Sequence, residues 1–590
     1  MERLSRIWAQ IESRKASAGL WLICLWGAAV GLFHATAQAS VESTQVIARV
    51  VAWPKLTYDM ICGAESWCLL NQVPAALLAW QIPWLTESFL SLAISATAAL
   101  LIVSGLYALV YVLTRSARVA LLGPALLLVT GLHRWGLTYP VEIVNYTHSN
   151  GTFGLGLVFW IMALLASERK RWGLFLFGLL ACVHVSWFVL LFPVLLLFAI
   201  DVLFIDRRPP RPLLIALGAG LALSALSYAA HWASTRPLMA QAPTFSMAQY
   251  QLIFRSFAQF WDGHRAPVPL RATGFSLSLL LLASLGAFGL LLRNGGLSRS
   301  AGRLWGFLLV SIAMALSLAL LSHLPFHLQP TPLLFLMPGR VMGIPIMLFV
   351  PLALALLALA EARFGDREFP VFPLFAGTFL LLQTRSLPPN PWQVPSTGLY
   401  FLAALLAIGF VALLAKGWEP PSRRRLHRWA WALLLSIALA VPVYQGIQNV
   451  RAGTVAYEMQ NFRNDPFWKK VHADPGPILT ASDCHFLQYK TGRPIVVNGW
   501  NAVVYLPRYA VAATEAIHEL YGVDFTGKPT GDQAYEGSLR HRATFSNRSL
   551  DEWRSLSLRY GFSNVIARPS TRLALTPVLS NADYVYYRIP

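Results

Sequence analysis

Charged residues are scarce in this chain, and their scarcity excludes an ordinary water-soluble protein. Only 13% of its 590 residues are Asp, Glu, Lys or Arg, whereas 56% are hydrophobic. A soluble domain needs roughly 25% charged residues to cover its surface. Many apolar runs reach the ~20 residues that a helix needs to cross the ~30 Å hydrocarbon core of a bilayer. The composition therefore predicts a mainly α-helical, polytopic membrane protein.

Metal-binding clusters and the signature loops of soluble enzymes are also missing. The five cysteines are scattered, and no CxxC or Cys/His cluster indicates a structural metal. Cys62 and Cys68 share one segment, which we expect outside the cytoplasm, where a disulfide can persist. The chain shows no obvious internal repeat and almost no charge within its central apolar segments, which disfavours an ion-coupled transporter.

The charge that is present is strongly basic, with a formal net charge of +20. In a soluble protein this excess would suggest nucleic acid as the partner. Here the basic residues stand in short runs between apolar segments, at 169–171, 207–208 and 423–425. That pattern is typical of cytoplasmic loops under the positive-inside rule. We therefore expect a bacterial inner-membrane protein whose partner is the lipid bilayer, with no nucleic-acid partner.

Charge alternation along the chain predicts its topology. Residues 1–18 form a cytoplasmic flank, residues 19–446 form a transmembrane helical bundle, and residues 447–590 form a small extracytoplasmic α/β domain. The length rule gives about thirteen spans, with the N-terminus cytoplasmic and the C-terminal domain periplasmic or extracellular. The expected outer loops are 37–86, 133–152, 232–273, 324–340 and 385–396.

The apolar region 173–204 is too long for one ordinary span and is interrupted at His184. If it is a pair of short helices that turn near His184, the basic run at 207–208 falls on the cytoplasmic side, as the positive-inside rule requires. Short, broken helices are tolerated where protein or water covers the freed backbone groups. The sequence therefore predicts a helical pair with His184 near the outer surface.

Within loop 232–273, apolar residues recur at helical spacing between Tyr250 and Phe260. This spacing predicts an amphipathic helix. Such a helix can lie at the outer interface as a lid over a lipid substrate, or it can simply pack against protein. We favour the packing helix.

After residue 447 the composition becomes that of a soluble α/β domain. We expect strands at 477–480, 495–498, 564–567 and 584–589, and a helix at 508–520. A second helix should begin with the capping box Ser549–Glu552 and end at Gly561. No phosphate-binding glycine loop or nucleophile elbow is present. Gating or partner docking thus fits this domain better than catalysis, although four polar residues are candidate ligand contacts: Asp483, His485, Arg493 and His518.

Chemistry is expected instead in the outer loops, beside a cavity open to lipid. A carboxylate there can take a proton from an attacking hydroxyl, or hold a divalent metal that neutralises a leaving diphosphate. Arginine suits bidentate phosphate binding. The candidate catalytic residues are Asp59, Glu65 and Glu142, and Asp59 is the candidate ligand of a Mg²⁺ or Mn²⁺ ion. The candidate substrate-binding residues are His133, Arg134, His148, His184 and Arg340.

The layout of many helices, a long first outer loop with an acidic residue and an outer C-terminal domain resembles the GT-C glycosyltransferase superfamily. The stretches 173–197, 486–500, 551–567 and 583–590 are similar to uncharacterised bacterial relatives found with exopolysaccharide genes. The resemblance implies transfer from a polyprenyl-phosphate-linked sugar at the outer face, in cell-surface or exopolysaccharide synthesis. It implies a lipid-linked sugar and other polysaccharide-synthesis membrane proteins as partners. This chain departs from the pattern in lacking an Asp-X-Asp pair in its first loop and in having Val185 after His184 in place of proline.

Two other functions remain open at this stage. An O-antigen-type polymerase or ligase would use outer-loop histidine and arginine without a metal, but such chains usually place their large soluble loop between late helices. A non-enzymatic transport or assembly component of polysaccharide export would leave no motif.

Overall fold

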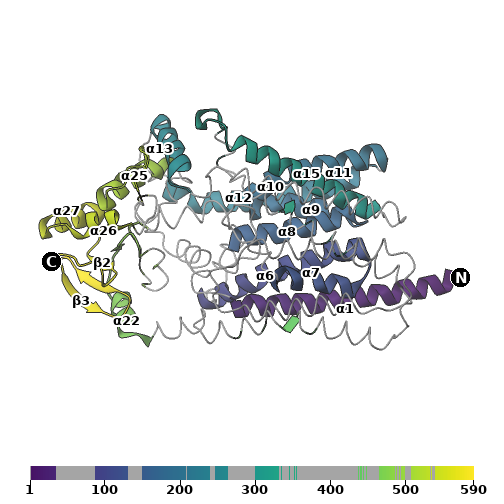
Figure 1. Cartoon of the computed structure of the whole chain (residues 1–590), viewed down its shortest axis with the longest axis horizontal. Helices are drawn as coiled ribbons and strands as arrows, with labels where there is room; N and C mark the ends of the chain where they lie inside the picture. Colours follow the sequence, from purple (N-terminus) through teal and green to yellow (C-terminus); the bar gives the residue numbers. More distant parts are fainter. Residues whose placement is uncertain are drawn as a thin grey trace.

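The computed structural model describes two groups of elements, a helical bundle and a C-terminal α/β unit (Figure 1). The residues described are 2–34, 87–129, 149–207, 209–239, 246–262, 299–330, 334, 344–345, 348, 351, 354, 436, 439–440, 443, 447, 464–484, 487, 491, 493, 495–497, 507–531, 533 and 538–590.

The bundle consists of long apolar helices. Its elements are α1 (Glu2–His34), α6 (Glu87–Thr114), α7 (Ala117–Val129), α8 (Ser149–Ala166), α9 (Lys170–Val183), α10 (Val185–Leu190), α11 (Phe192–Ile200), a π-helix (Asp201–Ile205), α12 (Arg211–Met239) and α15 (Arg299–Leu321). Among the described residues, four segments are long and apolar enough to cross a membrane: Ala96–Thr114, Val185–Ile205, Arg211–Ala229 and Arg299–Leu321. Most spans expected after residue 322, and the one expected at 274–293, lie outside the described residues, so the total of thirteen stays a prediction.

Small residues allow these helices to approach closely. α1 runs antiparallel to α6, with Gly19 against Tyr107 and Gly27 against Val103. The Tyr107 hydroxyl donates to the carbonyl of Ala16 at 3.0 Å. A Cβ atom at Gly156 of α8 would lie only 2.7 Å from the Leu101 side chain on α6. Such contacts are typical of membrane helices, which associate by close packing because lipid is as apolar as their side chains.

The helix directions place the basic turns of the described bundle at one end. α1 begins there, α6 ends there just before Arg115, and α8 ends there before Arg169. Arg299, at the start of α15, lies there too, because it pairs with Asp206. The C-terminal unit lies at the opposite end, on the left of Figure 1, while the N-terminus lies on the right. This arrangement agrees with the charge alternation of the sequence, which the positive-inside rule explains.

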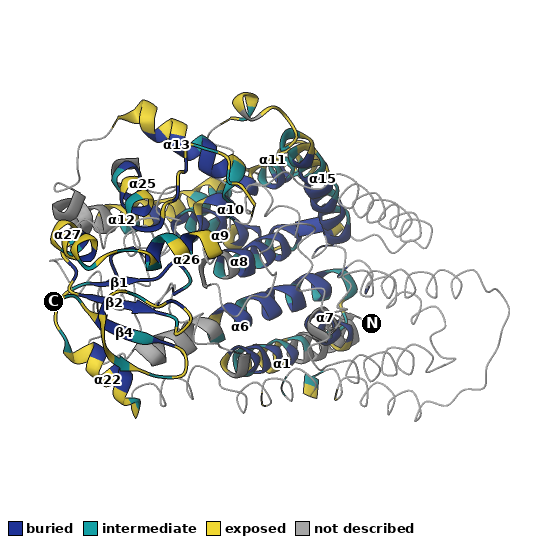
Figure 2. Ribbon diagram, turned by 60° about the vertical axis from the view of Figure 1, so that its left-hand side comes forward, coloured by how far each residue is buried: buried dark blue, intermediate teal, exposed yellow. Residues whose placement is uncertain are grey.

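The C-terminal unit is built on a four-stranded sheet with the strand order β1-β2-β4-β3. β1 (Ile478–Thr480) pairs in parallel with β2 (Asn564–Ala567), whereas β4 (Val585–Arg588) is antiparallel to both β2 and β3 (Thr576–Ser580). Helices α22 (Pro466–Ala473), α25 (Pro507–Tyr521), α26 (Leu539–Ser546) and α27 (Leu550–Tyr560) surround it. β1 and β2 are wholly buried, as the dark ribbons of Figure 2 show.

Most elements expected after residue 447 are confirmed one by one. The Ser549 amide donates to Glu552 Oε2 at 2.7 Å, and the Glu552 amide donates back to Ser549 Oγ at 3.3 Å. Gly561 ends α27 with a φ of 70°, the left-handed conformation that glycine adopts without strain. The expected strand at 495–498 is reduced to an isolated bridge between Ile495 and Ile478. β3 was not expected, because its exposed residues and Pro577 mark an edge strand with weak apolar periodicity.

α13 (Met247–Phe260) confirms the amphipathic helix predicted in loop 232–273. Its apolar face packs against the C-terminal unit, so the lipid-lid interpretation is wrong for this face. Phe257 and Trp261 both contact the ring of Phe525, at 5.0 and 5.1 Å between centroids. Trp261 Nε1 also donates to the carbonyl of Gly527 at 3.0 Å. A helix between two apolar segments thus completes the core of the C-terminal unit.

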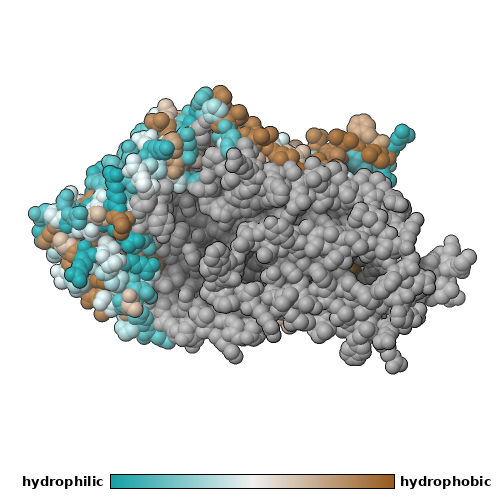
Figure 3. Space-filling view, in the orientation of Figure 1, coloured by the Kyte–Doolittle hydropathy of each residue, from teal (hydrophilic) through white to brown (hydrophobic). Residues whose placement is uncertain are grey.

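The exposed surface differs between the two groups of elements. In Figure 3 the C-terminal unit is a mixture of hydrophilic and apolar side chains, whereas hydrophobic side chains gather over the described helices along the upper edge. Exposed apolar residues on α11 and α12 include Phe192, Leu196, Leu214, Ile215 and Leu226. A wide apolar surface on helices of this length is what contact with lipid requires.

Candidate functional site: a helical hairpin and its two ends

The region 170–206 folds back on itself as a hairpin. Phe177 of α9 lies 4.9 Å from Phe188 of α10 and 6.1 Å from Phe192 of α11, between ring centroids. In one straight helix Phe177 and Phe188 would be about 16 Å apart, at ~1.5 Å of rise per residue. The far ends also meet, because Lys170 pairs with Asp206. The predicted pair of helices with a turn near His184 is therefore confirmed.

His184 makes the turn. Its amide donates to the carbonyl of Leu180 at 2.8 Å, which closes α9, and its backbone is extended, with a φ of −160°. Its side-chain Nδ1 accepts from the amide of Trp187 at 3.3 Å and so caps α10. Because Nδ1 accepts, a neutral His184 ring carries its proton on Nε2.

The turn is held against the start of α8. A Cβ atom at Gly154 would lie 2.8 Å from the Cβ of His184 and 2.4 Å from Cδ1 of Trp187. His184 is only 4% exposed, and its ring lies 6.2 Å from that of Trp187. The buried turn therefore adjoins the segment that enters α8, which the sequence assigns to the end of outer loop 133–152.

The opposite end of the hairpin carries an ionic cluster centred on the buried side chains of Lys170, Asp206 and Arg303. We define the cluster as these three together with Asp201 and the exposed Arg299. Arg303 Nε donates to Asp201 Oδ2 at 2.6 Å, and Arg303 Nη2 donates to Asp206 Oδ2 at 2.7 Å. Lys170 and Arg299 also pair with Asp206. Arg303 Nη1 reaches the carbonyl of Ala166 at 3.4 Å. The cluster thus ties together the end of α8, both ends of the hairpin and the start of α15.

Electrostatics keep the Asp206 carboxylate of this cluster ionised. Burial by itself would raise the pKa of Asp206, but the pairing with Lys170, Arg303 and Arg299 outweighs burial and lowers it. Arg303 and Lys170 are 6% and 3% exposed. A buried charge is tolerated when charged partners satisfy it. Both oxygens of the Asp206 carboxylate pair with cationic side chains of the protein. We therefore interpret the cluster as a structural tie and not as a substrate site.

Sequence reasoning missed this cluster. The basic run at 207–208 was interpreted only as loop charge, and the central apolar segments were judged to be nearly free of charge. Asp201 stands at the end of an apolar span, where an acidic residue normally signals a specific partner. That signal was present, but Arg303 lies 102 residues further along the chain, and spacing alone does not reveal so distant a partner.

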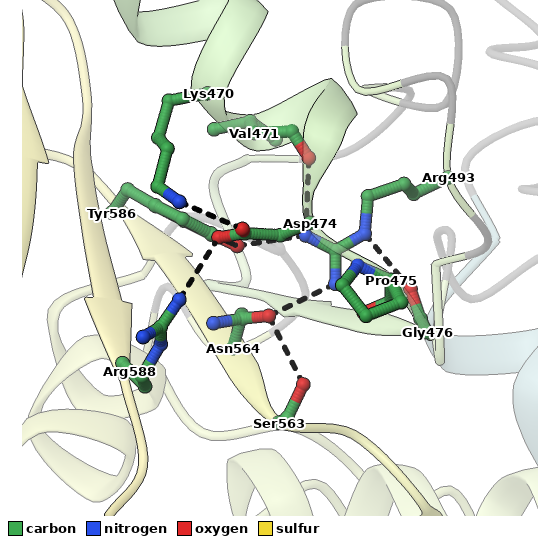
Figure 4. Close-up of polar contacts among 10 residues, drawn as sticks. All are labelled: Lys470, Val471, Asp474, Pro475, Gly476, Arg493, Ser563, Asn564, Tyr586 and Arg588. Carbon is green, nitrogen blue, oxygen red and sulfur yellow. Dashed lines mark hydrogen bonds and ion pairs between the residues drawn. The ribbon is translucent and has the colours of Figure 1, made fainter.

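Arg493, a candidate ligand contact, is instead the centre of a structural network (Figure 4). It is 4% exposed. Its guanidinium donates to the carbonyls of Gly476 at 2.8 Å, Val471 at 3.1 Å and Pro475 at 2.6 Å. It also donates to the side chains of Tyr586 at 2.7 Å and Asn564 at 2.9 Å. All three guanidinium nitrogens are used within the protein, so the ligand-contact hypothesis for Arg493 is wrong.

Two of the other candidate contacts in this unit have internal partners. Asp483 pairs with Arg542 at 3.4 Å, and Nδ1 of His518 lies 3.2 Å from the carbonyl of Val523. His485 lies outside the described residues.

The structure describes His184 alone among the eight expected site residues. Asp59, Glu65, His133, Arg134, Glu142, His148 and Arg340 lie outside the described residues, so their convergence stays a prediction. Within the described residues, no group of three or more His, Cys, Asp or Glu side chains has the geometry to hold a metal ion. The expected Mg²⁺ or Mn²⁺ ligand Asp59 is not among them.

Comparison with known proteins finds a distant structural likeness. No protein-family profile matches the sequence, and no curated protein matches it. The structure is similar to the crystal structure of ArnT from Cupriavidus metallidurans in the apo state, with 13% sequence identity and a TM-score of 0.47. The alignment covers 100% of this chain and 98% of that chain. So distant a likeness carries no argument about function.

Proposed function

We propose that this chain is a membrane glycosyltransferase that takes a sugar from a polyprenyl-phosphate carrier at the outer face of the inner membrane, for cell-surface or exopolysaccharide synthesis. The outer carboxylates Asp59, Glu65 and Glu142 act as base or metal ligand, and Asp59 holds a Mg²⁺ or Mn²⁺ ion if one is used. His133, Arg134, His148, His184 and Arg340 bind the lipid-linked substrate. Other polysaccharide-synthesis membrane proteins are its expected partners.

The observation that carries this proposal is the polarity of the bundle. The ionic cluster and the basic turns share one end, and the His184 turn and the C-terminal unit share the other. Basic turns favour the cytoplasmic side. The proposal therefore puts the His184 turn and the entry into α8 on the outer side of the membrane together.

His184 suits a binding role better than a catalytic one. Its Nδ1 accepts the hydrogen bond that caps α10, so protonation of that nitrogen would break this hydrogen bond and weaken the turn. In the neutral ring Nε2–H is a donor, and an imidazole donor suits a phosphate or sugar oxygen.

The test is carried out in a strain in which the chromosomal copy is deleted and the variant chain is supplied. Asp59→Asn should abolish the cell-surface glycan, because an amide neither accepts a proton nor neutralises a metal. The matched control is Asp551→Asn, at a carboxylate whose side chain is 91% exposed on α27; it should leave the glycan unchanged. Unchanged glycan with Asp59→Asn would remove that residue from the mechanism.

A chelator experiment separates the glycosyltransferase from the polymerase or ligase alternative. Sugar transfer by the purified chain in proteoliposomes should fall when EDTA is added and return with Mg²⁺ or Mn²⁺. Full activity in EDTA would favour the metal-free polymerase or ligase chemistry.

A further inference from the structure

The basic end of the hairpin carries more positive charge than its own carboxylates can neutralise. The segments 168–171, 201–211 and 299–303 contain eight basic and three acidic residues. Two of the three acids belong to the ionic cluster, whose three cations already outnumber them. The third acid, Glu168, stands beside Arg169 in the turn between α8 and α9. An excess of positive charge therefore remains at this end.

Three exposed arginines carry much of this excess: Arg171, Arg207 and Arg211. The first two each follow a residue of the cluster, Lys170 and Asp206, and the third begins α12. Within the described ranges, no carboxylate pairs with any of these three guanidiniums. Their counterions must therefore come from outside the protein.

These arginines belong to one junction. The ion pair between Lys170 and Asp206 joins the start of α9 to the end of the hairpin, and Arg171 and Arg207 are the next residues on the two sides of that pair. Arg211 is five residues beyond Asp206, so it lies within about 18 Å of it even along a fully extended chain. One headgroup region of a bilayer leaflet can therefore meet all three.

An exposed apolar stripe runs along the hairpin to this junction. Phe192, Leu196, Ile200 and Phe204 stand on successive turns, four residues apart, and each is exposed, with Phe204 72% exposed. Arg207 follows three residues after the last of them. In Figure 3 the hydrophobic side chains along the upper edge end on the right in hydrophilic ones. The surface thus offers apolar contact along its length and positive charge at its end.

α12 repeats this arrangement beside the hairpin. Its first residue, Arg211, is followed by the exposed Leu214 and Ile215. Most of its apolar span, Arg211–Ala229, is exposed as well. A second helix therefore presents an exposed arginine directly before an exposed apolar surface.

This combination of groups fits an anionic phospholipid. A guanidinium binds phosphate oxygens through two parallel hydrogen bonds, and basic sites between transmembrane helices take the headgroups of anionic lipids. A zwitterionic lipid would bring its own cation towards the arginines, and a free phosphate would leave the apolar stripe unused. Both the charge and the stripe are used only by a lipid with a net negative headgroup and acyl chains.

We propose that the junction of α9, the hairpin end and α12 is a binding site for an anionic phospholipid of the adjoining leaflet. Arg171, Arg207 and Arg211 bind its phosphate, and its acyl chains lie along the exposed apolar residues from Phe192 to Phe204. The site is at the end of the bundle opposite the His184 turn, and binding at it does not require transfer activity.

Native mass spectrometry of the full chain in detergent tests the proposal with three probes: phosphatidylglycerol, phosphatidylcholine and glycerol 1-phosphate. The first phosphatidylglycerol should bind at least tenfold more tightly than phosphatidylcholine, and glycerol 1-phosphate should not bind at the same concentration. The double variant Arg207→Gln/Arg211→Gln should weaken phosphatidylglycerol binding more than tenfold, because each basic residue near an anionic lipid contributes about fivefold. Arg207→Lys/Arg211→Lys should keep most of the preference, since the charge remains.

The matched control removes the same charge from the C-terminal unit. Arg540→Gln/Arg572→Gln, at two exposed arginines, should bind phosphatidylglycerol as the parent chain does. If Arg207→Gln/Arg211→Gln lowers the thermal unfolding midpoint in lipid-free detergent, Arg171→Gln takes its place, because it leaves the 206–211 connection unchanged. It should weaken binding about fivefold.

Three results would overturn the proposal. One is equal affinity of the parent chain for the two lipids. Another is unchanged phosphatidylglycerol binding in the glutamine variants at the junction, or an equal loss in the C-terminal control. The third is binding of glycerol 1-phosphate as tight as that of phosphatidylglycerol, which would make the arginines a site for free phosphate.

Discussion

Within the described residues, the helical bundle and the C-terminal unit each bury an arginine at the junction of several elements, but they satisfy it differently. Arg303 joins α15 to the hairpin through two carboxylates, Asp201 and Asp206, and one carbonyl. Arg493 joins α22, β2 and β4 through three backbone carbonyls and two neutral side chains. Its nearest acidic neighbour in the network, Asp474, contacts it only through the Tyr586 hydroxyl.

The difference reflects how each region deals with charge. At the end of an apolar bundle, a guanidinium needs countercharges, because lipid and apolar side chains provide no solvation. In the α/β unit, carbonyls at strand and helix ends already point at the guanidinium and share its charge. Removing either arginine leaves acceptors behind, but only in the bundle are those acceptors ionised. We therefore expect different costs, and the following predictions are arranged by size.

The largest effect is expected for Arg303→Met, which leaves the buried carboxylates of Asp201 and Asp206 with one fewer cation. Breaking a buried ion pair costs about 3–5 kcal/mol. The free energy of unfolding, measured by SDS titration of the purified chain, should fall by that amount. Adding Asp201→Asn should recover part of the loss, because one uncompensated charge disappears. If Asp201→Asn lowers the free energy of unfolding as much in the Arg303→Met background as it does alone, the pairing of Asp201 with Arg303 does not stabilise this end.

A smaller effect is expected for Arg493→Met, because the acceptors left behind are neutral. Unsatisfied buried acceptors cost about 1–3 kcal/mol each before the unit relaxes, and we expect about 3 kcal/mol in total. Limited proteolysis should then cut the C-terminal unit while the bundle stays intact. Arg588→Gln is the control, because Arg588 is 55% exposed and reaches Asp474 only at 3.4 Å. Equal protease resistance of the two variants would contradict the role assigned to Arg493.

Close packing of α12 on α9 predicts the next effect. A Cβ atom at Gly220 would lie 2.2 Å from the carbonyl oxygen of Phe175, whereas one at Gly218 would meet nothing within 4 Å. Gly220→Ala should therefore destabilise the bundle by about 1–3 kcal/mol through overpacking. Gly218→Ala, on the same helix, should be neutral or slightly stabilising, since alanine has the higher helix propensity. The two unfolding midpoints in detergent check the comparison, and identical midpoints would mean that α12 does not pack on α9 as described.

The smallest effect is a pH dependence of the C-terminal unit. Burial alone would raise the pKa of Asp474, but Lys470, Tyr586 and Arg588 outweigh burial and lower it. A carboxyl whose folded pKa is depressed contributes stability above its ordinary pKa and loses that contribution as the pH falls through the folded value. Protease resistance of the unit should therefore be constant down to about pH 4 and fall below it. Asp474→Asn should flatten that fall, and an unchanged acid profile would contradict the pairing.

Local patterns in the sequence were enough to predict some of these features. The break at His184 was predicted because the apolar region is too long for one span. A turn there also puts the basic run at 207–208 on the cytoplasmic side, as the positive-inside rule requires. The helix after Ser549 was predicted because a capping box and a terminal glycine specify its two ends within the short stretch from Ser549 to Gly561. Over so short a distance, local backbone chemistry decides the structure.

Features that depend on distant partners were not predictable in the same way. The contact of Phe257 with Phe525, and the pairing of Asp201 with Arg303, join parts of the chain that sequence spacing does not relate.

The central claim is that the His184 turn and the C-terminal unit lie on the non-cytoplasmic side, opposite the basic end of the bundle. A chain without its native cysteines, carrying either Ser555→Cys on α27 or Glu168→Cys beside the basic run, tests it with a membrane-impermeant maleimide. Both positions are exposed in the structure. The account predicts labelling of Ser555→Cys in cells whose inner membrane is sealed, and labelling of Glu168→Cys only after that membrane is permeabilised. Labelling of Glu168→Cys across the sealed membrane, with Ser555→Cys protected, would contradict it.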